Sequence, residues 1–224
     1  MKRFNYIGGL GLAVAACAPP GPVAPAGTFT PSSREAFAAV AQRTLPERHE
    51  IVRFRWRSDD GRMQLAGAGA ARVAPPDSLR LDISASLGLG RAVLILAGER
   101  VEADPEIVTR MLPDRFALWT VLGYLRAPDA DRVEHLTDGA RTFWRTTDAA
   151  GRVTTFELRG DTLAGVVREE GGRMTQQLRL ERGPDGRVNR AQLDDHAHGA
   201  RFVMDITGRE SSEAFPDATW RLRP

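Results

Sequence analysis

Residues 51–61 read Ile-Val-Arg-Phe-Arg-Trp-Arg-Ser-Asp-Asp-Gly, and this stretch decides the fold. Its apolar residues Val52, Phe54 and Trp56 alternate with arginines, which is typical of a β-strand with one buried and one solvated face. The Asp-Asp-Gly that follows is typical of a tight turn. The stretch therefore predicts a strand, a turn and a returning antiparallel strand.

Similar short alternating segments occupy most of the chain. Besides the strand from Ile51, we expect strands at residues 63–73, 79–83, 92–96, 142–146, 153–158, 162–167, 174–180, 188–193 and 202–206, and one from Val133. Turn-forming residues such as Gly171-Gly172 and Pro184-Asp185-Gly186 separate them. Because a sheet of about 10–11 strands twists and curls, we expect a mainly β (α+β) fold, an open antiparallel half-barrel.

The strand at 63–73 is unusual because it contains the small residues Ala66-Gly67-Ala68-Gly69-Ala70-Ala71 in succession. Small side chains allow another group to approach the backbone closely. The strand is either bulged or sharply curved beneath an N-terminal helix, or it contacts a ligand.

Two segments have helical periodicity instead. Ser32 or Ser33 can cap an N-terminal helix that Pro46 ends, with one apolar face formed by Ala36, Phe37, Val40, Ala41 and Leu45. Residues 105–125 predict two short helices separated at Pro113, and the second is apolar around most of its circumference. We expect these helices to plug the half-barrel.

The N-terminus has the parts of a secretory signal. Lys2 and Arg3 precede a short apolar run, residues 7–16, and Cys17 follows its small residues. This pattern resembles the signal peptide and lipobox of bacterial lipoproteins. The resemblance implies removal of residues 1–16 and lipidation of Cys17, so that a covalent diacylglycerol and acyl chain anchor the protein in a membrane. The alternatives are an ordinary secretory signal with a chance cysteine, or a short anchor. The run is well below the ~20 residues that a spanning helix needs.

Composition narrows the function classes. Removing residues 1–16 removes Lys2, the sole lysine, and Arg3, so that 31 basic residues become 29 against 29 acidic ones. Since the arginines are spread among acidic residues instead of forming a basic patch, we do not expect nucleic-acid binding. Residues 17–31, rich in proline and alanine, predict an extended tether after the lipidated cysteine. Residues 32–224 then form a single domain, expected to be a monomer.

The order of these elements over residues 33–207 resembles the LolA/LolB superfamily of periplasmic lipoprotein-localisation factors, and especially its membrane-anchored LolB type. The resemblance also rests on Leu79-Arg80-Leu81 leading to Leu87-Gly88, and on the insert from Leu112-Pro113 to Leu122-Gly123. It implies an incomplete antiparallel barrel whose helical lid encloses an apolar cavity for acyl chains. The C-terminal extension from Phe215 to Trp220 departs from the simplest LolB pattern.

The resemblance directs attention to apolar residues on strands and lid. The candidates for an acyl-chain cavity are Leu81, Ile83, Leu94, Leu96, Met111, Phe116, Trp119, Leu122 and Leu125. A concave apolar surface with few polar groups suits such a ligand, but the same residues can equally form a solid core. Leu87 matches the exposed leucine of the LolB type. Leu87 and Leu89 either contact a membrane or tuck under the barrel.

Catalytic motifs are scarce. There is no Gly-x-Ser-x-Gly elbow, and Gly88-Leu89-Gly90 lacks the later glycine of a dinucleotide site. His196 and His198, in the run Asp194 to His198, are the best candidates for a metal site, since alternate strand positions share a face. The neighbouring Gly199 and the polar run favour a hairpin turn instead.

The sequence therefore predicts a non-enzymatic lipoprotein with no resident metal or cofactor. It binds acyl chains of lipoproteins or lipids and assists their localisation, with a periplasmic carrier protein as a possible partner. Ala18 stands where an aspartate commonly signals inner-membrane retention in the lipoprotein class. This resemblance favours anchoring in the outer membrane, facing the periplasm. The alternative is a structural lipoprotein of an envelope assembly with the same fold, and a surface-anchored hydrolase or metal-binding protein is the third candidate.

Overall fold

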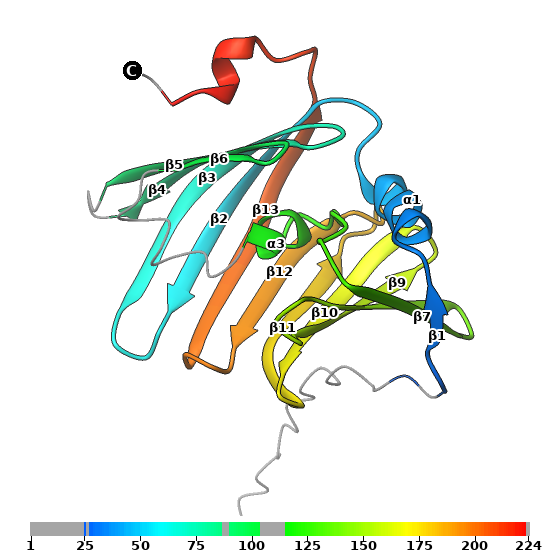
Figure 1. Cartoon of the computed structure of the whole chain (residues 1–224). Helices are drawn as coiled ribbons and strands as arrows, with labels where there is room; N and C mark the ends of the chain where they lie inside the picture. The colour runs from blue at the N-terminus through cyan, green and yellow to red at the C-terminus, as the bar shows by residue number, and fades with distance from the viewer. Residues whose placement is uncertain (1–24, 26, 87–89, 104–114, 223–224) are drawn as a thin grey trace, which may run out of the picture.

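A computed structural model describes residues 25, 27–86, 90–103 and 115–222. Within these residues, thirteen strands form one antiparallel sheet (Figure 1). The strands are β1 (Thr30–Ser32), β2 (Glu50–Asp59), β3 (Gln64–Ala74), β4 (Ser78–Ala85), β5 (Arg91–Ala97), β6 (Arg100–Ala103), β7 (Arg132–Asp138), β8 (Arg141–Thr147), β9 (Val153–Arg159), β10 (Thr162–Glu170), β11 (Arg173–Arg182), β12 (Val188–Asp195) and β13 (Ala200–Ser211). The mainly β, open antiparallel architecture is confirmed. The count exceeds our expectation because the short strands β1 and β6 were not predicted.

The strand order shows how the two halves of the chain form one open sheet. The order is β1-β7-β8-β9-β10-β11-β12-β13-β2-β3-β4-β5-β6, so two meanders join where β13 pairs with β2. Arg201 lies opposite Asp59 at one end of this pair, and Ser211 lies opposite Glu50 at the other. The pairing joins the C-terminal part of the chain to the stretch that decides the fold.

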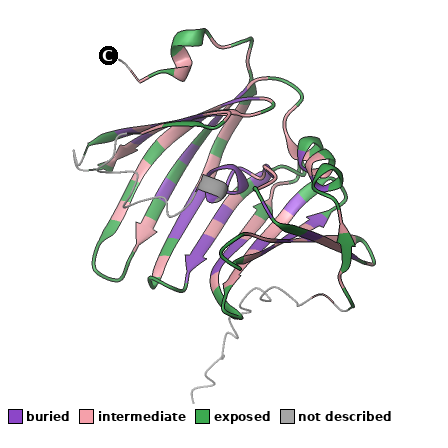
Figure 2. Ribbon diagram, viewed as in Figure 1, coloured by how far each residue is buried: buried purple, intermediate pink, exposed green. Residues whose placement is uncertain are grey.

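The sheet is strongly curved, with helix α3 (Arg115–Thr120) on its concave side and helix α1 (Arg34–Thr44) at one end (Figure 1). Buried residues recur along the inner strands and in the segment after α3 (Figure 2). In β2, the side chains of Val52, Phe54 and Trp56 are at most 2% exposed. The intervening arginines lie on the other face, where Arg53 forms an ion pair with Glu210. The alternation in residues 51–57 thus decides which face of β2 is buried.

The small residues of β3 make room for the aromatic residues of β2. Gly69 lies opposite Phe54, and Gly67 opposite Trp56. A Cβ atom on Gly69 would stand 2.6 Å from the Phe54 ring, and one on Gly67 would stand 2.8 Å from the Trp56 ring. Both distances are shorter than carbon atoms tolerate, so glycine is required for the two rings to lie across β3. The Ser84 carbonyl oxygen of β4 would stand 1.9 Å from a Cβ on Gly67, so the close approach that the sequence suggests is made by neighbouring side chains and by backbone.

Helix α1 follows the prediction closely. The Ser33 hydroxyl caps it by accepting a hydrogen bond from the Ala36 N–H. Its Phe37 ring stacks on Trp144 at 5.2 Å between ring centroids and lies 5.4 Å from Phe156. Aromatic pairs at this separation stabilise a fold by more than the burial of their apolar area alone. They join the helix to β8 and β9.

The predicted helical insert is only partly described. Helix α3 is shorter than expected, because it ends at Thr120 and the chain turns through residues 121–123. Gly123 has a φ of +90°, which is outside the helical region and favours glycine. Residues 115–125 are called the covering segment below, since they lie over the concave face of the sheet. The first predicted helix, before Pro113, lies outside the described residues.

Both ends of the described chain contact the sheet, one by strand pairing and the other through a short helix. Thr30–Ser32, which we placed largely in the tether, pair with β7 as β1. The C-terminal extension forms a short 3-10 helix, η2 (Asp217–Trp220), which contacts β4 and β5. Arg80 and Arg100 donate hydrogen bonds to the Thr219 and Trp220 carbonyls. Of the helices in the described ranges, none combines the length and apolar character of a transmembrane helix.

Candidate functional site

The predicted cavity residues that the structure describes lie together. Leu81, Ile83, Leu94 and Leu96 project from β4 and β5, and Trp119, Leu122 and Leu125 come from the covering segment. All seven belong to one apolar cluster, and their exposed fractions range from 0 to 8%. Cross-strand pairing places Leu81 opposite Leu94. The apolar side chains of the covering segment are therefore buried in the same cluster as those of the sheet.

Some predicted residues cannot be placed. Cys17, Leu87, Leu89 and Met111 lie outside the described residues, as does the Phe116 side chain. Their predicted roles in lipidation, membrane contact and acyl-chain binding stay predictions.

Polar contacts hold the end of the covering segment. The Leu125 N–H donates to the Thr44 hydroxyl at 2.7 Å, which ties the segment to the end of α1. The guanidinium of Arg209 donates to the Leu122 carbonyl at 2.8 Å. The Tyr124 hydroxyl donates to the Glu50 carboxylate. The segment is thus fixed at its C-terminal end by groups from α1, β2 and β13.

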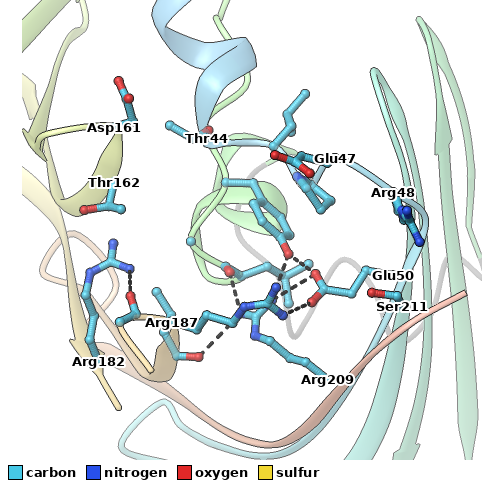
Figure 3. Close-up of a pocket in the computed structure, with 17 residues that line it drawn as sticks. Thr44, Glu47, Arg48, Glu50, Asp161, Thr162, Arg182, Arg187, Arg209 and Ser211 are labelled. Carbon is cyan, nitrogen blue, oxygen red and sulfur yellow. Dashed lines mark hydrogen bonds and ion pairs between the residues drawn. The ribbon is translucent and has the colours of Figure 1, made fainter. Parts of the chain in front are cut away.

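These groups adjoin a cavity of about 580 Å³, shown in Figure 3. Its wall combines the end of α1, the start of β2, the turn between β9 and β10, the turn between β11 and β12, and the end of β13. The charged and hydroxyl-bearing residues of the wall are Thr44, Glu47, Arg48, Glu50, Tyr124, Asp161, Thr162, Arg182, Arg187, Arg209 and Ser211. Sequence reasoning did not find this cavity, because residues distant in the sequence meet there only through the β13–β2 pairing.

A buried ion-pair network forms one side of the cavity. The Glu50 side chain is 5% exposed and accepts hydrogen bonds from Arg187 at 2.9 Å and from Arg209 at 3.2 Å (Figure 3). Arg209, whose side chain is 10% exposed, also donates to the Tyr124 hydroxyl at 2.8 Å. Burial raises the pKa of Tyr124. The phenol is therefore neutral at physiological pH and donates a hydrogen bond to the Glu50 carboxylate.

The histidine candidates lie away from both sites. His196 and His198 occupy the exposed hairpin turn between β12 and β13. The Nδ1 atom of His198 lies 3.0 Å from the Asp195 carboxylate. In the described ranges, no group of three or more His, Cys, Asp or Glu side chains is arranged to hold a metal ion.

The neighbouring Asp194 is a buried carboxylate on β12 with several donors. Its oxygens accept hydrogen bonds from the Arg201 side chain at 2.6 Å and from the Arg179 and Gln192 side chains at 2.9 Å each. Burial opposes ionisation, but the hydrogen bonds from Gln192 and Arg201 and the arginine charges outweigh it and hold the Asp194 pKa below its usual value.

Asp194→Asn is expected to lower the free energy of unfolding by about 1.5–3 kcal/mol at pH 7. Because the pKa is lower in the folded state, the carboxylate stabilises the fold above the unfolded pKa of about 3.9. This contribution is lost as the pH falls through the folded pKa. Urea denaturation at pH 7, 5 and 3 should show the difference from wild type shrinking with acid. Asp217→Asn, at an exposed site, controls for general loss of negative charge. A difference that grows toward pH 3 would contradict the prediction.

Comparison with solved structures identifies the fold. A LolA superfamily protein from Nitrosomonas europaea matches with a TM-score of 0.57 at 12% identity, over 85% of this chain and 98% of that one. A protein domain from Vibrio parahaemolyticus, described as outer membrane lipoprotein-sorting, matches with a TM-score of 0.53 at 11% identity, over 84% of this chain and 97% of that one. No protein-family model and no curated protein sequence matches the chain. The resemblance drawn from the sequence is thus confirmed at the level of structure, and the chain has a LolA/LolB-like fold.

Proposed function

We propose that this protein is an outer-membrane lipoprotein that binds acyl chains of lipoproteins or lipids on its concave face and assists their localisation. The observation that carries the proposal is the single apolar cluster that Trp119, Leu122 and Leu125 of the covering segment share with the buried side chains of β4 and β5. A segment that moved aside would leave a concave apolar surface of the kind that suits an acyl chain. The LolA/LolB-like fold supports the same role.

The free energy of burying an acyl chain is large enough for the chain to replace side chains of the covering segment. Each methylene buried from water contributes about 0.8 kcal/mol, so a long acyl chain offsets the loss of several side-chain contacts. Trp119, Leu122 and Leu125 are the groups that such a chain would replace in the apolar cluster. The role is one of binding and needs no titrating catalytic group.

The proposed location rests on the N-terminal sequence. A lipidated Cys17 would hold the protein on a membrane, because several acyl chains together give stable anchoring. Ala18 after the cysteine supports the outer membrane, with the folded domain facing the periplasm. The acyl-bearing partner would be delivered by a periplasmic carrier protein.

Native mass spectrometry of residues 18–224, purified from a bacterial periplasm, tests the binding proposal. We expect a co-purifying acyl species, or uptake of an added lipopeptide, in the wild-type protein. Trp119→Asp should abolish it, because a carboxylate on the concave face opposes contact with an acyl chain. Trp220→Asp, the same substitution in η2, should retain it. Circular dichroism establishes that each variant is folded.

An envelope protein with a permanently filled interior is the second candidate. The observation that favours it is the burial of all seven described cavity residues, which together form a closed core. In that case the wild-type protein carries no acyl species and takes up no lipopeptide. The same measurement therefore separates the two functions.

A further inference from the structure

The wall of the charged cavity beside the covering segment contains four arginines, Arg48, Arg182, Arg187 and Arg209, and three carboxylates, Glu47, Glu50 and Asp161. The charges of Glu47 and Arg48, which are both exposed, balance each other. Arg187 and Arg209 share the single carboxylate of Glu50, which leaves one positive charge in excess. Asp161 is paired with Arg43 at 2.8 Å, outside the cavity wall, and so does not offset this excess.

Arg182 adds a second positive charge to the same wall. Its guanidinium donates to the Gly186 carbonyl at 2.7 Å and to the Leu163 carbonyl, so its contacts are with neutral groups. In the part of the chain that the structure describes, no carboxylate pairs with it. Burial lowers the pKa of Arg182, and the charges of Arg209 and Arg159 lower it further. The charges of Arg182 and Arg209 therefore repel each other across the cavity.

An unused hydrogen-bond donor lies in the same network. The Nε atom of Arg209 is buried and has no hydrogen-bond partner among the described residues. A buried donor without a partner is unfavourable, so a ligand oxygen that accepted a hydrogen bond from it would be stabilised. Figure 3 shows Arg187 and Arg209 meeting at Glu50, with Arg182 on the opposite side of the cavity.

We propose that this cavity binds a phosphomonoester-type anion between Arg182 and the Arg187–Arg209 pair. A phosphomonoester carries about −1.5 to −2 charge at pH 7, which matches the excess of two guanidinium groups. Guanidinium groups present paired donors that suit phosphate oxygens. The volume of about 580 Å³ is within the usual range of 300–1,000 Å³ for ligand sites. The cavity shares Leu122 and Tyr124 with the covering segment, but the arginines proposed to contact the anion lie outside the apolar cluster. The proposal therefore does not depend on acyl-chain binding.

Isothermal titration calorimetry of the full chain carrying Cys17→Ser, at constant ionic strength, tests the proposal with inorganic phosphate as the probe. The wild-type cavity should show saturable binding. Arg182→Gln should weaken it at least about tenfold, since each lost charge-assisted hydrogen bond costs about 1.5–3 kcal/mol. Arg187→Gln is a second variant, at an exposed side chain, and should also weaken binding. Arg53→Gln removes an arginine of an exposed ion pair elsewhere on the sheet and should leave affinity unchanged.

Two outcomes would overturn the anion site. One is the absence of saturable phosphate binding by the wild-type cavity, and the other is an equal affinity in Arg182→Gln and Arg53→Gln. Dihexanoyl phosphatidic acid then distinguishes the source of the phosphate. Binding more than about tenfold tighter than inorganic phosphate, and weakened by Arg182→Gln, identifies a lipid headgroup. Equal affinity for the two probes identifies a free phosphate or a soluble phosphomonoester.

Discussion

Arg209→Met is expected to lower the free energy of unfolding by about 3–5 kcal/mol, because it removes one partner of a buried ion pair. Arg209 donates to Glu50, to the Tyr124 hydroxyl and to the Leu122 carbonyl, so one substitution leaves three acceptors short of a donor. Arg187 also pairs with Glu50, but its side chain is 57% exposed and cannot replace the buried contacts. Urea denaturation at pH 7 measures the change.

Two further variants control this result. Arg53→Met breaks an exposed ion pair with Glu210 and should cost about 0–1 kcal/mol. The double variant Glu50→Leu with Arg209→Met removes both charges, and replacing a buried pair by apolar residues is often neutral. The double variant should therefore be more stable than Arg209→Met alone. A single variant within about 1 kcal/mol of wild type would show that the network contributes little to stability.

The same network bears on the covering segment. Arg209 donates a hydrogen bond to the Leu122 carbonyl, and the Tyr124 hydroxyl donates one to Glu50. Leu122 and Tyr124 lie only a few residues after the end of α3. Gly123, between them, has a φ of +90°, and a Cβ there would stand 2.6 Å from a methyl group of Val188. The turn is therefore fixed by close packing as well as by charge. We infer that any motion that uncovers the concave face starts at the α3 end of the segment, away from these contacts.

Local periodicity was sufficient to predict most of the strands. Val52, Phe54 and Trp56 alternate with arginines because one face of β2 is buried and the other is solvated, and this pattern is visible without a structure. Helix α1 was equally visible, since Ser33 caps it and Pro46 follows its end. The short strands β1 and β6 have too few residues for a periodic pattern. They become strands because longer neighbours, β7 and β5, offer an edge to pair with.

The charged cavity could not be predicted, because its key contact joins Glu50 to Arg209 across most of the chain. That contact depends on the register of β13 on β2, in which Arg209 lies opposite Val52. A one-residue slip would turn Arg209 to the other face of the sheet, and nothing in the separate strand patterns specifies which strands pair. Helix α3 is shorter than its apolar pattern predicts, because the backbone at Gly123 leaves the helical region. Apolar residues after Thr120 stay buried without being helical.

The second large effect is expected for Trp119→Ala, which should lower the free energy of unfolding by about 3–5 kcal/mol. Trp119 is 1% exposed and belongs to the central apolar cluster, so its loss leaves a space that the surrounding side chains fill only partly. The cost measures how much of the stability comes from the covering segment. Urea denaturation of the wild-type and variant chains gives the difference, and Trp220→Ala, at a half-buried position in η2, should cost much less.

The response of this variant to palmitate separates an interior that accepts acyl chains from one that is closed. A ligand that binds only the folded state stabilises it by about 2.7 kcal/mol at 100 times its dissociation constant, and an apolar space opened by truncation readily takes an apolar ligand. If the concave face binds acyl chains, palmitate should raise the melting temperature of Trp119→Ala, whereas Trp119→Asp should not respond because its carboxylate opposes the chain. If palmitate leaves both the wild-type chain and Trp119→Ala unchanged, the apolar cluster is a structural core, and the acyl-binding proposal is wrong. A rise in the wild-type melting temperature that Trp119→Asp abolishes would place the acyl chain in the apolar cluster to which Trp119 belongs.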